Sequence, residues 1–300
     1  MTNQARPPVQ PITLPGVTIA SDDKLAVLAG PCVAESYELC VQIGSAVKER
    51  CDALGLGYVF KASYDKANRS SAGSARGPGV EEGLAMIVAV GRELGVPVTT
   101  DIHQPEQAAM AAEASGGGVD LLQVPAFLCR QTDLLVACGQ TGKAVNIKKG
   151  QFMSPAEMAT AVEKVRQASP SAQRLAPSAS PIMLTERGTF FGYHRLVNDF
   201  VGLGDLMDLG CPVCFDVTHS TQLPGAGAAD QTVVSGGRPE RAPLLARAAV
   251  AAGVDAVFIE THPDPAQALS DGATMLRLDD TLALLGELAK VRAAIADSAG

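Results

Sequence analysis

Short apolar segments recur along the chain, and apolar residues at helical spacing fill the intervals between them. The short segments have the character of buried strands and span residues 25–30, 58–62, 96–101, 119–124, 143–149, 181–187, 212–217 and 255–260. The intervals repeat apolar residues every three or four positions, as in EEGLAMIVAVGREL at 81–94 and RAPLLARAAVAAG at 241–253. Eight strand-then-helix units predict a protein of the α/β class that forms a single (β/α)8 TIM barrel.

An open, doubly wound sheet is the alternative arrangement of such units. It would place a G-x-G-x-x-G turn after an early strand, and the sequence contains no such turn. For the barrel, we expect the Pro-rich residues 1–23 to form an N-terminal arm or a short plug on the barrel bottom. Residues 24–300 then form the catalytic domain.

Two long connections differ in the face of the barrel on which they should lie. The Ala/Ser/Pro-rich stretch at 168–181 precedes the sixth strand, so we interpret it as a tolerated insertion on the bottom face. The Gly-rich stretch at 218–240 follows the seventh strand and belongs to the top face. Either a mobile lid or a plain solvent loop fits its composition.

Composition narrows the class of protein. Apolar residues make up 47% of the 300 positions but aromatic residues only 4%, so the core must be aliphatic, as in parallel β/α folds. A formal net charge of −8 argues against nucleic-acid or membrane-surface binding. The sequence has no run of about 18 apolar residues and no apolar core of a signal peptide near its N-terminus. We therefore expect a cytoplasmic protein.

The seven cysteines are an odd number, which favours reduced thiols in that compartment. One pair forms a C-x-x-C motif, Cys211 and Cys214. A redox pair of this kind usually begins a helix, where the helix dipole lowers the thiol pKa. This pair runs into the seventh predicted strand, so we interpret both thiols as packing residues.

Polar or reactive side chains follow every predicted strand, and barrel enzymes build their active sites at these carboxyl ends. In strand order they are Cys32; Lys61; Asp101 with His103; Gln123; Lys148 and Lys149; Glu186 and Arg187; Asp216 with His219; and Glu260 with His262. Strand ends meet solvent in any barrel, so single polar residues there carry little information. Eight together predict an enzyme.

The cationic side chains gather after the second, fifth and sixth strands. They are Lys61, Lys148 and Arg187, with Lys66 and Arg69 on the loop that follows the second strand. Cations at this density need an anionic ligand to offset their repulsion, and a guanidinium group binds phosphate through two hydrogen bonds. The pattern indicates a phosphorylated substrate.

A possible metal site comes from the first, seventh and eighth strands, which become neighbours when the barrel closes. Cys32, His219 and Glu260 offer a thiolate, an imidazole and a carboxylate, and Asp271 could be a fourth ligand. This donor set suits a divalent transition metal. Taken singly, each residue could instead be a packed thiol, a hydrogen-bonded histidine or a solvated acid.

The motifs GPCVAES, FKASYDKANRSS, RGPG, QVPAFLCRQTDL, NIKKGQF, FDVTHSTQ and FIETHPDP resemble those of one enzyme family. That family is 3-deoxy-D-manno-octulosonate 8-phosphate synthase, also named 2-dehydro-3-deoxyphosphooctonate aldolase. The resemblance covers residues from about 24 to 290. It implies a TIM barrel that condenses phosphoenolpyruvate with arabinose 5-phosphate and releases phosphate, in lipopolysaccharide biosynthesis.

The resemblance also implies roles for individual residues. Phosphoenolpyruvate would be held by Lys61, Lys66, Gln123, Lys148 and Arg187. Arabinose 5-phosphate would be held by Asn68, Arg69 and Ser70, with Ala126 beside the site and Arg130 reaching in from a neighbouring subunit, which implies a homotetramer. Lys66, Lys148, Asp101 and His103 are the candidate catalytic groups.

Two branches of this family differ after the first strand, where the metal-free branch has Asn and the metal-dependent branch has Cys. Cys32 therefore implies a divalent ion, Zn, Fe(II), Mn or Co, held by Cys32, His219, Glu260 and Asp271.

Three other functions remain open from the sequence. A sister synthase would use erythrose 4-phosphate, but its phosphate motif typically reads Lys-Pro-Arg, where this chain has KANRSS. A Schiff-base aldolase would need Lys148 as a neutral amine. A binding barrel without catalysis is the third.

Overall fold

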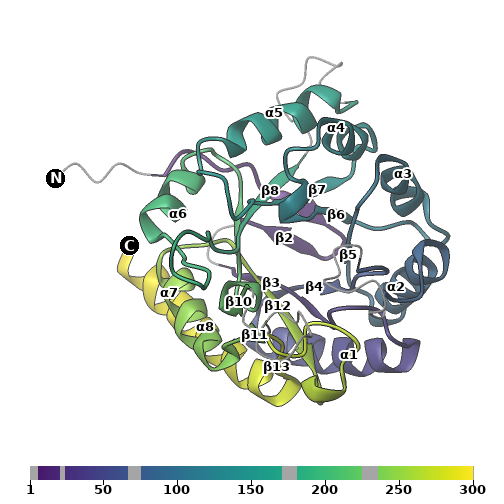
Figure 1. The fold of residues 1–300 in the computed structure, drawn as a ribbon. Helices are drawn as coiled ribbons and strands as arrows, with labels where there is room; N and C mark the ends of the chain where they lie inside the picture. Colours follow the sequence, from purple (N-terminus) through teal and green to yellow (C-terminus); the bar gives the residue numbers. More distant parts are fainter. Residues whose placement is uncertain (1–5, 21–23, 67–75, 171–180, 225–235, 300) are drawn as a thin grey trace.

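Eight parallel strands close into a barrel in the computed structural model, which describes residues 6–20, 24–66, 76–170, 181–224 and 236–299 (Figure 1). The barrel strands are β3 (Ala26–Gly30), β4 (Gly57–Lys61), β5 (Val98–Asp101), β6 (Leu121–Val124), β7 (Ala144–Lys148), β8 (Ile182–Glu186), β9 (Val213–Asp216) and β12 (Ala256–His262). Each pairs with the next in chain order, and β12 pairs with both β9 and β3. The predicted (β/α)8 barrel is confirmed.

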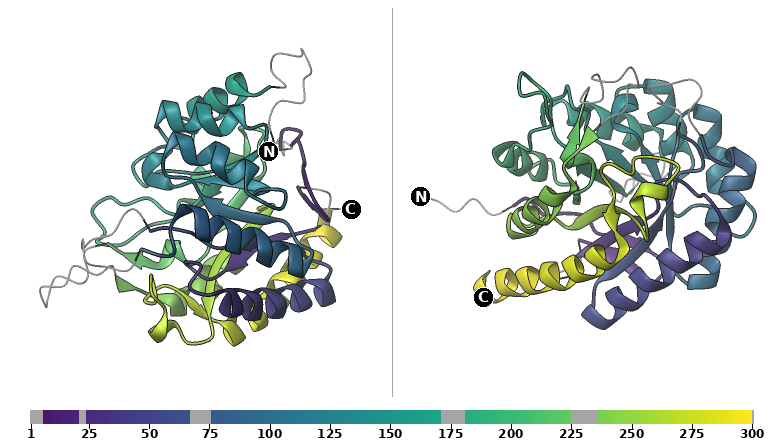
Figure 2. Two further views of the ribbon diagram at one scale, coloured as in Figure 1. Left: turned by 90° about the vertical axis from the view of Figure 1, so that its right-hand side faces the viewer. Right: turned by 60° about the horizontal axis from the view of Figure 1, so that its bottom comes forward.

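Helices surround the barrel and cover its outer surface (Figure 2). In the described part of the chain they are α1 (Tyr37–Leu54), α2 (Val80–Leu94), α3 (Pro105–Glu113), α4 (Thr132–Gln140), α5 (Met158–Ala168), α6 (Phe200–Met207), α7 (Ala242–Ala251) and α8 (Leu278–Ala299). Local signals set their limits: Ser36 accepts the Leu39 amide at the start of α1, and Gly55 ends it in the left-handed region. None of the described helices combines the length and apolarity needed to cross a bilayer.

The inside of the barrel changes from apolar to polar along the strands. Side chains alternate between the two faces of a strand, so every second residue points inward. The inward positions nearer the strand starts are apolar and belong to one buried cluster, as Leu28, Leu121 and Phe258 show. Two residues further on, the inward positions of β6 and β12 are Gln123 and Glu260, both buried. This alternation places a polar layer at the carboxyl ends of the strands.

A hairpin near the N-terminus closes the bottom of the barrel. Its strands β1 (Ile12–Leu14) and β2 (Val17–Ile19) pair antiparallel, and Ile12 and Ile19 are fully buried against the apolar interior cluster. Arg6 ties the preceding segment to the start of β12 through two bonds to Asp255, at 3.0 and 2.7 Å. The arm therefore completes the apolar core from below.

The cysteines pack as the sequence predicts. All seven are buried and free, and Cys211 and Cys214 lie in two different apolar clusters. The loop regions 168–181 and 218–240 are described only in part, since residues 171–180 and 225–235 lie outside the described ranges.

Gly30, at the end of β3, permits the closest strand-to-strand approach beneath the polar layer. A Cβ atom at this position would lie 2.0 Å from the backbone oxygen of Lys61, at the end of the neighbouring β4. Both atoms belong to the barrel framework, so neither can rotate away. A side chain here would push Lys61 out of place.

We predict that Gly30→Ala lowers the free energy of unfolding by about 3 kcal/mol, because the added methyl group overpacks the barrel wall. Gly204→Ala is the matched control, since a Cβ there meets no atom within 4 Å and Gly204 lies on an exposed turn of α6. The control should be neutral or more stable by up to about 1 kcal/mol. Equal unfolding midpoints by circular dichroism for the two variants would contradict this packing account.

Candidate active site

A layer of buried polar side chains crosses the top of the barrel interior. Its members are Lys61, Asp101, Gln123, Asn146, Lys148, Thr185, Asp216 and Glu260, contributed by seven neighbouring strands, and all are at most 9% exposed. Its ammonium groups pair with its carboxylates, Lys61 with Glu260 and Lys148 with Asp216, so these buried charges are offset. The loops after β3, β4 and β9 add further ionisable groups to the same region.

The predicted metal ligands lie together on one side of this layer. Ligand atoms of Cys32, Glu260 and Asp271 lie within 4.8 Å of one another, and the Cys32 Sγ is 3.0 Å from the Asp271 Oδ2. Burial, and next the Glu260 carboxylate, raise the pKa of the Cys32 thiol well above its ordinary value. In the described part of the chain, Oε2 of Glu260 is buried without a hydrogen-bond partner.

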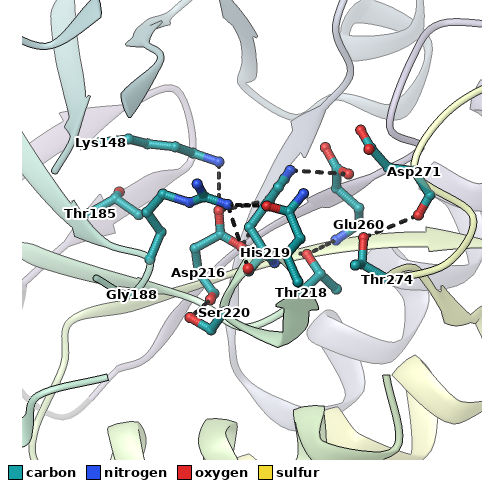
Figure 3. Close-up of polar contacts among 12 residues, drawn as sticks. Lys148, Thr185, Gly188, Asp216, Thr218, His219, Ser220, Glu260, Asp271 and Thr274 are labelled. Atoms are coloured by element: carbon teal, nitrogen blue, oxygen red, sulfur yellow. Dashed lines mark hydrogen bonds and ion pairs between the residues drawn. The ribbon is translucent and has the colours of Figure 1, made fainter. Parts of the chain in front are cut away.

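His219 points its imidazole at this cluster. It lies in the short 3-10 helix His219–Thr221 after β9, with Nε2 at 3.7 Å from the Glu260 Oε2. Its Nδ1 contacts Asp216 at 2.9 and 3.1 Å. A carboxylate on Nδ1 fixes the ring orientation and leaves the Nε2 lone pair free to bind a cation. Figure 3 shows Glu260 and Asp271 together on the far side of His219 from Lys148.

The donor types fit a divalent transition metal, since a thiol and two carboxylates converge, one carboxylate oxygen lacks a hydrogen-bond partner, and the His219 Nε2 lies 3.7 Å from that oxygen. The four residues come from three separate strand ends and the loop after β12. Three of the four predicted ligands, Cys32, Glu260 and Asp271, form a cluster that could hold a metal ion, and His219 lies beside it, so the set of four stays a prediction.

Two lysines, one at the end of β4 and one on the loop after it, neutralise the Glu260 carboxylate. Lys61 forms an ion pair with Glu260 and donates to the Cys32 carbonyl at 3.1 Å, and Lys66 lies 3.7 Å from the same carboxylate. Burial alone would raise the pKa of Glu260, but the two ammonium groups hold it well below its usual range. Burial would lower the pKa of Lys66, but Cys32 and Glu260 raise it well above its ordinary value.

Asp216 connects the predicted phosphoenolpyruvate lysine to the predicted metal histidine. Its Oδ2 accepts from the Lys148 Nζ at 2.7 Å, and its other oxygen contacts His219 (Figure 3). Burial opposes ionisation, but His219 and Lys148 keep the pKa of Asp216 below its ordinary value. The Lys148 ammonium also lies 3.6 Å from the centre of the Phe258 ring, a cation–π contact.

Arg187 reaches the same segment from β8. Its Nη2 donates to the Gln222 Oε1 at 2.6 Å and lies 3.5 Å from the His219 carbonyl. Burial lowers the pKa of this guanidinium. Lys148 and Arg187 thus meet at one loop, as a shared anionic ligand would require.

Asp101 and Gln123 occupy the opposite side of the layer. Asp101 accepts from both Ser63 and Gln123, and Lys61 and Lys66 keep the pKa of its carboxyl below the ordinary value against the effect of burial. His103 packs edge-on against Tyr64, with ring centroids 5.6 Å apart, and burial lowers its pKa. Its buried Nδ1 has no hydrogen-bond partner among the described residues.

Of the other predicted binding residues, only Ala126 and Arg130 are among the described residues. Asn68, Arg69 and Ser70 lie outside the described residues, although Lys66, which precedes them, contacts the metal-ligand cluster. Ala126 is buried in the 3-10 helix Ala126–Leu128 after β6. Arg130 is exposed, and its backbone carbonyl accepts a hydrogen bond from the Lys164 Nζ at 3.3 Å.

The sequence-based prediction omitted some residues of the polar layer, and it assigned to the barrel rim two residues that point away from the interior. Asn146 and Thr185 were not singled out, and Asp216 was noted only as a strand end, yet all three point inward. Lys149 and Glu186 instead form an ion pair at 3.4 Å that fastens the β7 and β8 loops. Strict alternation from the apolar interior positions Ala144, Met183 and Cys214 would have found the three inward residues.

Comparison with known proteins agrees with this geometry. The model of the DAHP synthetase I family matches residues 3–296. The chain belongs to the DAHP synthetase I family. Proteins named 2-dehydro-3-deoxyphosphooctonate aldolase are similar to it over most of its length, so the resemblance seen in the motifs is confirmed.

Three such relatives illustrate the similarity. The Synechococcus sp. protein is 50% identical over 276 residues, which is 92% of this chain and 91% of the relative. The Koribacter versatilis protein is 50% identical over 96% of this chain and 98% of its own. The Nitratidesulfovibrio vulgaris (strain DP4) protein is 51% identical over 87% of this chain and 90% of its own.

We predict that the free energy of unfolding falls steeply in acid, and that this fall is smaller in the variant Asp216→Asn. The folded-state pKa of Asp216 is lower than its unfolded value, so its contribution is present above about pH 4 and is lost as the pH falls below that. At pH 7 Asp216→Asn should be less stable than the wild type, because Lys148 loses its partner. Between pH 7 and pH 3 its free energy of unfolding should fall less than that of the wild type.

Asp205→Asn, at an exposed carboxylate of α6, is the control and should show the wild-type loss. The measurement is the midpoint of urea unfolding at each pH. An equal loss for the wild type and both variants would mean that Asp216 is not held ionised by its neighbours.

Proposed function

We infer that this protein condenses phosphoenolpyruvate with D-arabinose 5-phosphate and water to give 3-deoxy-D-manno-octulosonate 8-phosphate and inorganic phosphate. It is an enzyme of the transferase class that forms a carbon–carbon bond. The observation that carries this conclusion is that half-identical relatives are named 2-dehydro-3-deoxyphosphooctonate aldolase and that cationic side chains are buried together at the barrel top. The function also places the protein in lipopolysaccharide biosynthesis.

Phosphoenolpyruvate is the ligand of the described cationic groups. Lys61, Lys66, Lys148 and Arg187 are all at most 8% exposed, and Gln123 adds an amide between them. Burial keeps water away from these cations, so each of them would interact strongly with a phosphate or carboxylate. Arabinose 5-phosphate binds on the loop that carries Asn68, Arg69 and Ser70, with Arg69 and Ser70 on its phosphate.

The reaction joins C3 of the enol to the aldehyde carbon, while a water oxygen bonds to C2. The resulting tetrahedral intermediate breaks its C2–O bond to phosphate, and the bonding electrons leave with the phosphate. Lys148 and Arg187 stabilise the negative charge as it moves toward the leaving group. The water loses both protons as its oxygen becomes the ketone oxygen at C2. One proton goes to the former aldehyde oxygen, which becomes the new hydroxyl, and the other goes to the departing phosphate, so a group that can accept and return a proton is required.

His103 and Asp101 are the candidates for this proton transfer. Burial lowers the pKa of His103, so the imidazole is neutral near pH 7 and able to accept a proton. Asp101, kept ionised by the neighbouring lysines, orients the groups of β4 and β6 around it.

A divalent metal, Zn, Fe(II), Mn or Co, is the proposed cofactor, held by Cys32, His219, Glu260 and Asp271. Such an ion supplies Lewis-acid polarisation of an aldehyde or lowers the pKa of a bound water. Asp216 holds the His219 ring in the orientation that this role needs, and the unpartnered Glu260 Oε2 supports the ligand set.

The surroundings of Lys148 disfavour a Schiff-base aldolase. A lysine nucleophile must be neutral. The Lys148 Nζ instead donates to the Asp216 carboxylate at 2.7 Å and lies over the Phe258 ring, so both contacts occupy the nitrogen that would attack a carbonyl. Lys148 is therefore suited to binding an anion through its charge.

We further propose a cytoplasmic homotetramer that binds small-molecule substrates. Large exposed aromatic side chains follow β6, β7 and β8, namely Phe127, Phe152, Phe190 and Phe191, exposed by 53, 48, 44 and 87%. Aromatic groups in this number favour burial in a subunit interface. Arg130 lies two residues after the Ala126–Leu128 helix, so this interface would direct it toward a neighbouring active site.

We predict phosphate release when the protein is mixed with phosphoenolpyruvate and arabinose 5-phosphate, and at most weak release with erythrose 4-phosphate. Lys148→Ala should lower kcat/KM by about 100-fold or more, since it removes a buried cation from the developing charge. Lys143→Ala, at the opposite end of β7, is the matched control and should retain activity. A preference for erythrose 4-phosphate in a colorimetric phosphate assay would assign the sister reaction.

We predict that exhaustive chelation abolishes turnover and that Mn²⁺ or Fe²⁺ restores it. Cys32→Ala should lower metal affinity by more than about 100-fold, beyond the range seen for groups that only orient ligands. Cys51→Ala changes a buried thiol on α1 and should bind metal normally. Metal content by mass spectrometry and turnover are measured together. Full activity in metal-free protein would refute the metal requirement.

A further inference from the structure

A continuous chain of side-chain hydrogen bonds crosses the polar layer from β4 to β8. Ser63 and Gln123 both donate to Asp101, Asn146 donates its Nδ2 to the Gln123 Oε1 at 3.0 Å, and Thr185 donates its hydroxyl to the Asn146 Oδ1 at 2.6 Å. Asn146 and Thr185 are fully buried, and the reaction as described gives them no part.

The direction of every bond in this chain follows from one carboxylate. Asp101 is kept ionised by Lys61 and Lys66, and an ionised carboxylate can only accept hydrogen bonds. Gln123 must therefore turn its amide nitrogen toward Asp101 and its oxygen toward β7. That oxygen needs a donor, which Asn146 supplies through its own amide nitrogen.

Thr185 supplies the last hydrogen-bond donor, at the β8 end of the chain of hydrogen bonds. With its nitrogen committed to Gln123, Asn146 presents Oδ1 to β8, and the oxygen accepts the Thr185 hydroxyl. The strand register helps, because Asp101 is paired with Gln123 and Gln123 with Asn146 on successive strands. A reversed Gln123 amide would set oxygen against the Asp101 carboxylate and nitrogen against the Asn146 nitrogen.

We propose that Asn146 and Thr185 are positioning residues that lock the Gln123 amide with its nitrogen available to the anionic substrate. An amide NH2 group has two N–H bonds, and Asp101 uses one of them, so the second remains for a phosphate or carboxylate oxygen. An amide turned the other way would present its carbonyl oxygen, which repels an anion. This inference rests on the proposed binding of phosphoenolpyruvate by Gln123.

The test compares two substitutions at Thr185 that separate hydrogen bonding from packing. Thr185→Val keeps the shape but loses the hydroxyl, and Thr185→Ser keeps the hydroxyl but loses the methyl group. We expect Thr185→Val to weaken phosphoenolpyruvate binding about threefold to tenfold and Thr185→Ser to leave it close to wild type. If Thr185 acted only through packing, Thr185→Ser would weaken binding more than Thr185→Val.

Substitutions at Asn146 extend the series. Asn146→Leu leaves the Gln123 oxygen without a donor and should weaken binding about tenfold. Asn146→Asp places a second acceptor-only group next to Gln123, in addition to Asp101. The Gln123 amide then cannot donate to one neighbour and accept from the other. We expect Asn146→Asp to weaken phosphoenolpyruvate binding more than Asn146→Leu does. Thr100→Val is the matched control, because Thr100 adjoins Asp101 on β5 and its buried hydroxyl has no partner among the described residues.

The readouts are the Kd of phosphoenolpyruvate by titration calorimetry without sugar, and kcat and both KM values from phosphate release. The proposal expects changes in Kd and in KM for phosphoenolpyruvate, with kcat and KM for arabinose 5-phosphate altered little. The unfolding midpoint of the Asn146 variants should fall, because they leave a buried group unsatisfied, so binding is measured at a temperature where each variant is folded. Wild-type affinity in both Thr185→Val and Asn146→Leu would overturn the positioning role while leaving the proposed function in place. A wild-type protein that does not bind phosphoenolpyruvate would overturn both.

Discussion

Closure of the sheet is the constraint on which the rest of this molecule depends. β12 pairs in parallel with β9 on one side and with β3 on the other, so chain segments more than two hundred residues apart become neighbours. The register sets Glu260 opposite Gly30, two residues before Cys32. Because Gly30 has no side chain, β4 packs close enough for Lys61 to reach Glu260. An open sheet would separate these groups by its full width.

The polar layer at the top of the closed barrel pairs buried charges, and the same pairs form the proposed binding site. Buried carboxylates and ammonium groups are costly singly, and pairing offsets much of that cost. The pairs also hold the cations in fixed positions before any substrate arrives, which is the condition for strong transition-state stabilisation. Asp216 illustrates both effects, since it satisfies Lys148 and orients His219. The stability of the barrel top and its proposed chemistry thus depend on the same contacts.

The sequence predicts the barrel well, because the short apolar runs of the strands and the three-to-four-residue apolar spacing of the helices are both clear. Strand segments and helical intervals alternate along the whole chain, and the eight predicted strands match the barrel strands closely. The metal-ligand candidates follow from strand ends and motifs. Asn146 and Thr185 were missed because their types are unremarkable and only their inward direction matters. Lys149 and Glu186 were placed at the rim because adjacency in sequence does not tell which face a side chain occupies.

An anomalous-difference map from crystals grown with Mn²⁺ and phosphoenolpyruvate tests the central claim most directly. The account predicts one manganese peak among Cys32, His219, Glu260 and Asp271, with the substrate beside it in contact with Lys148, Arg187 and the Gln123 nitrogen. A manganese peak away from these four residues, or phosphoenolpyruvate bound outside the polar layer, would contradict it.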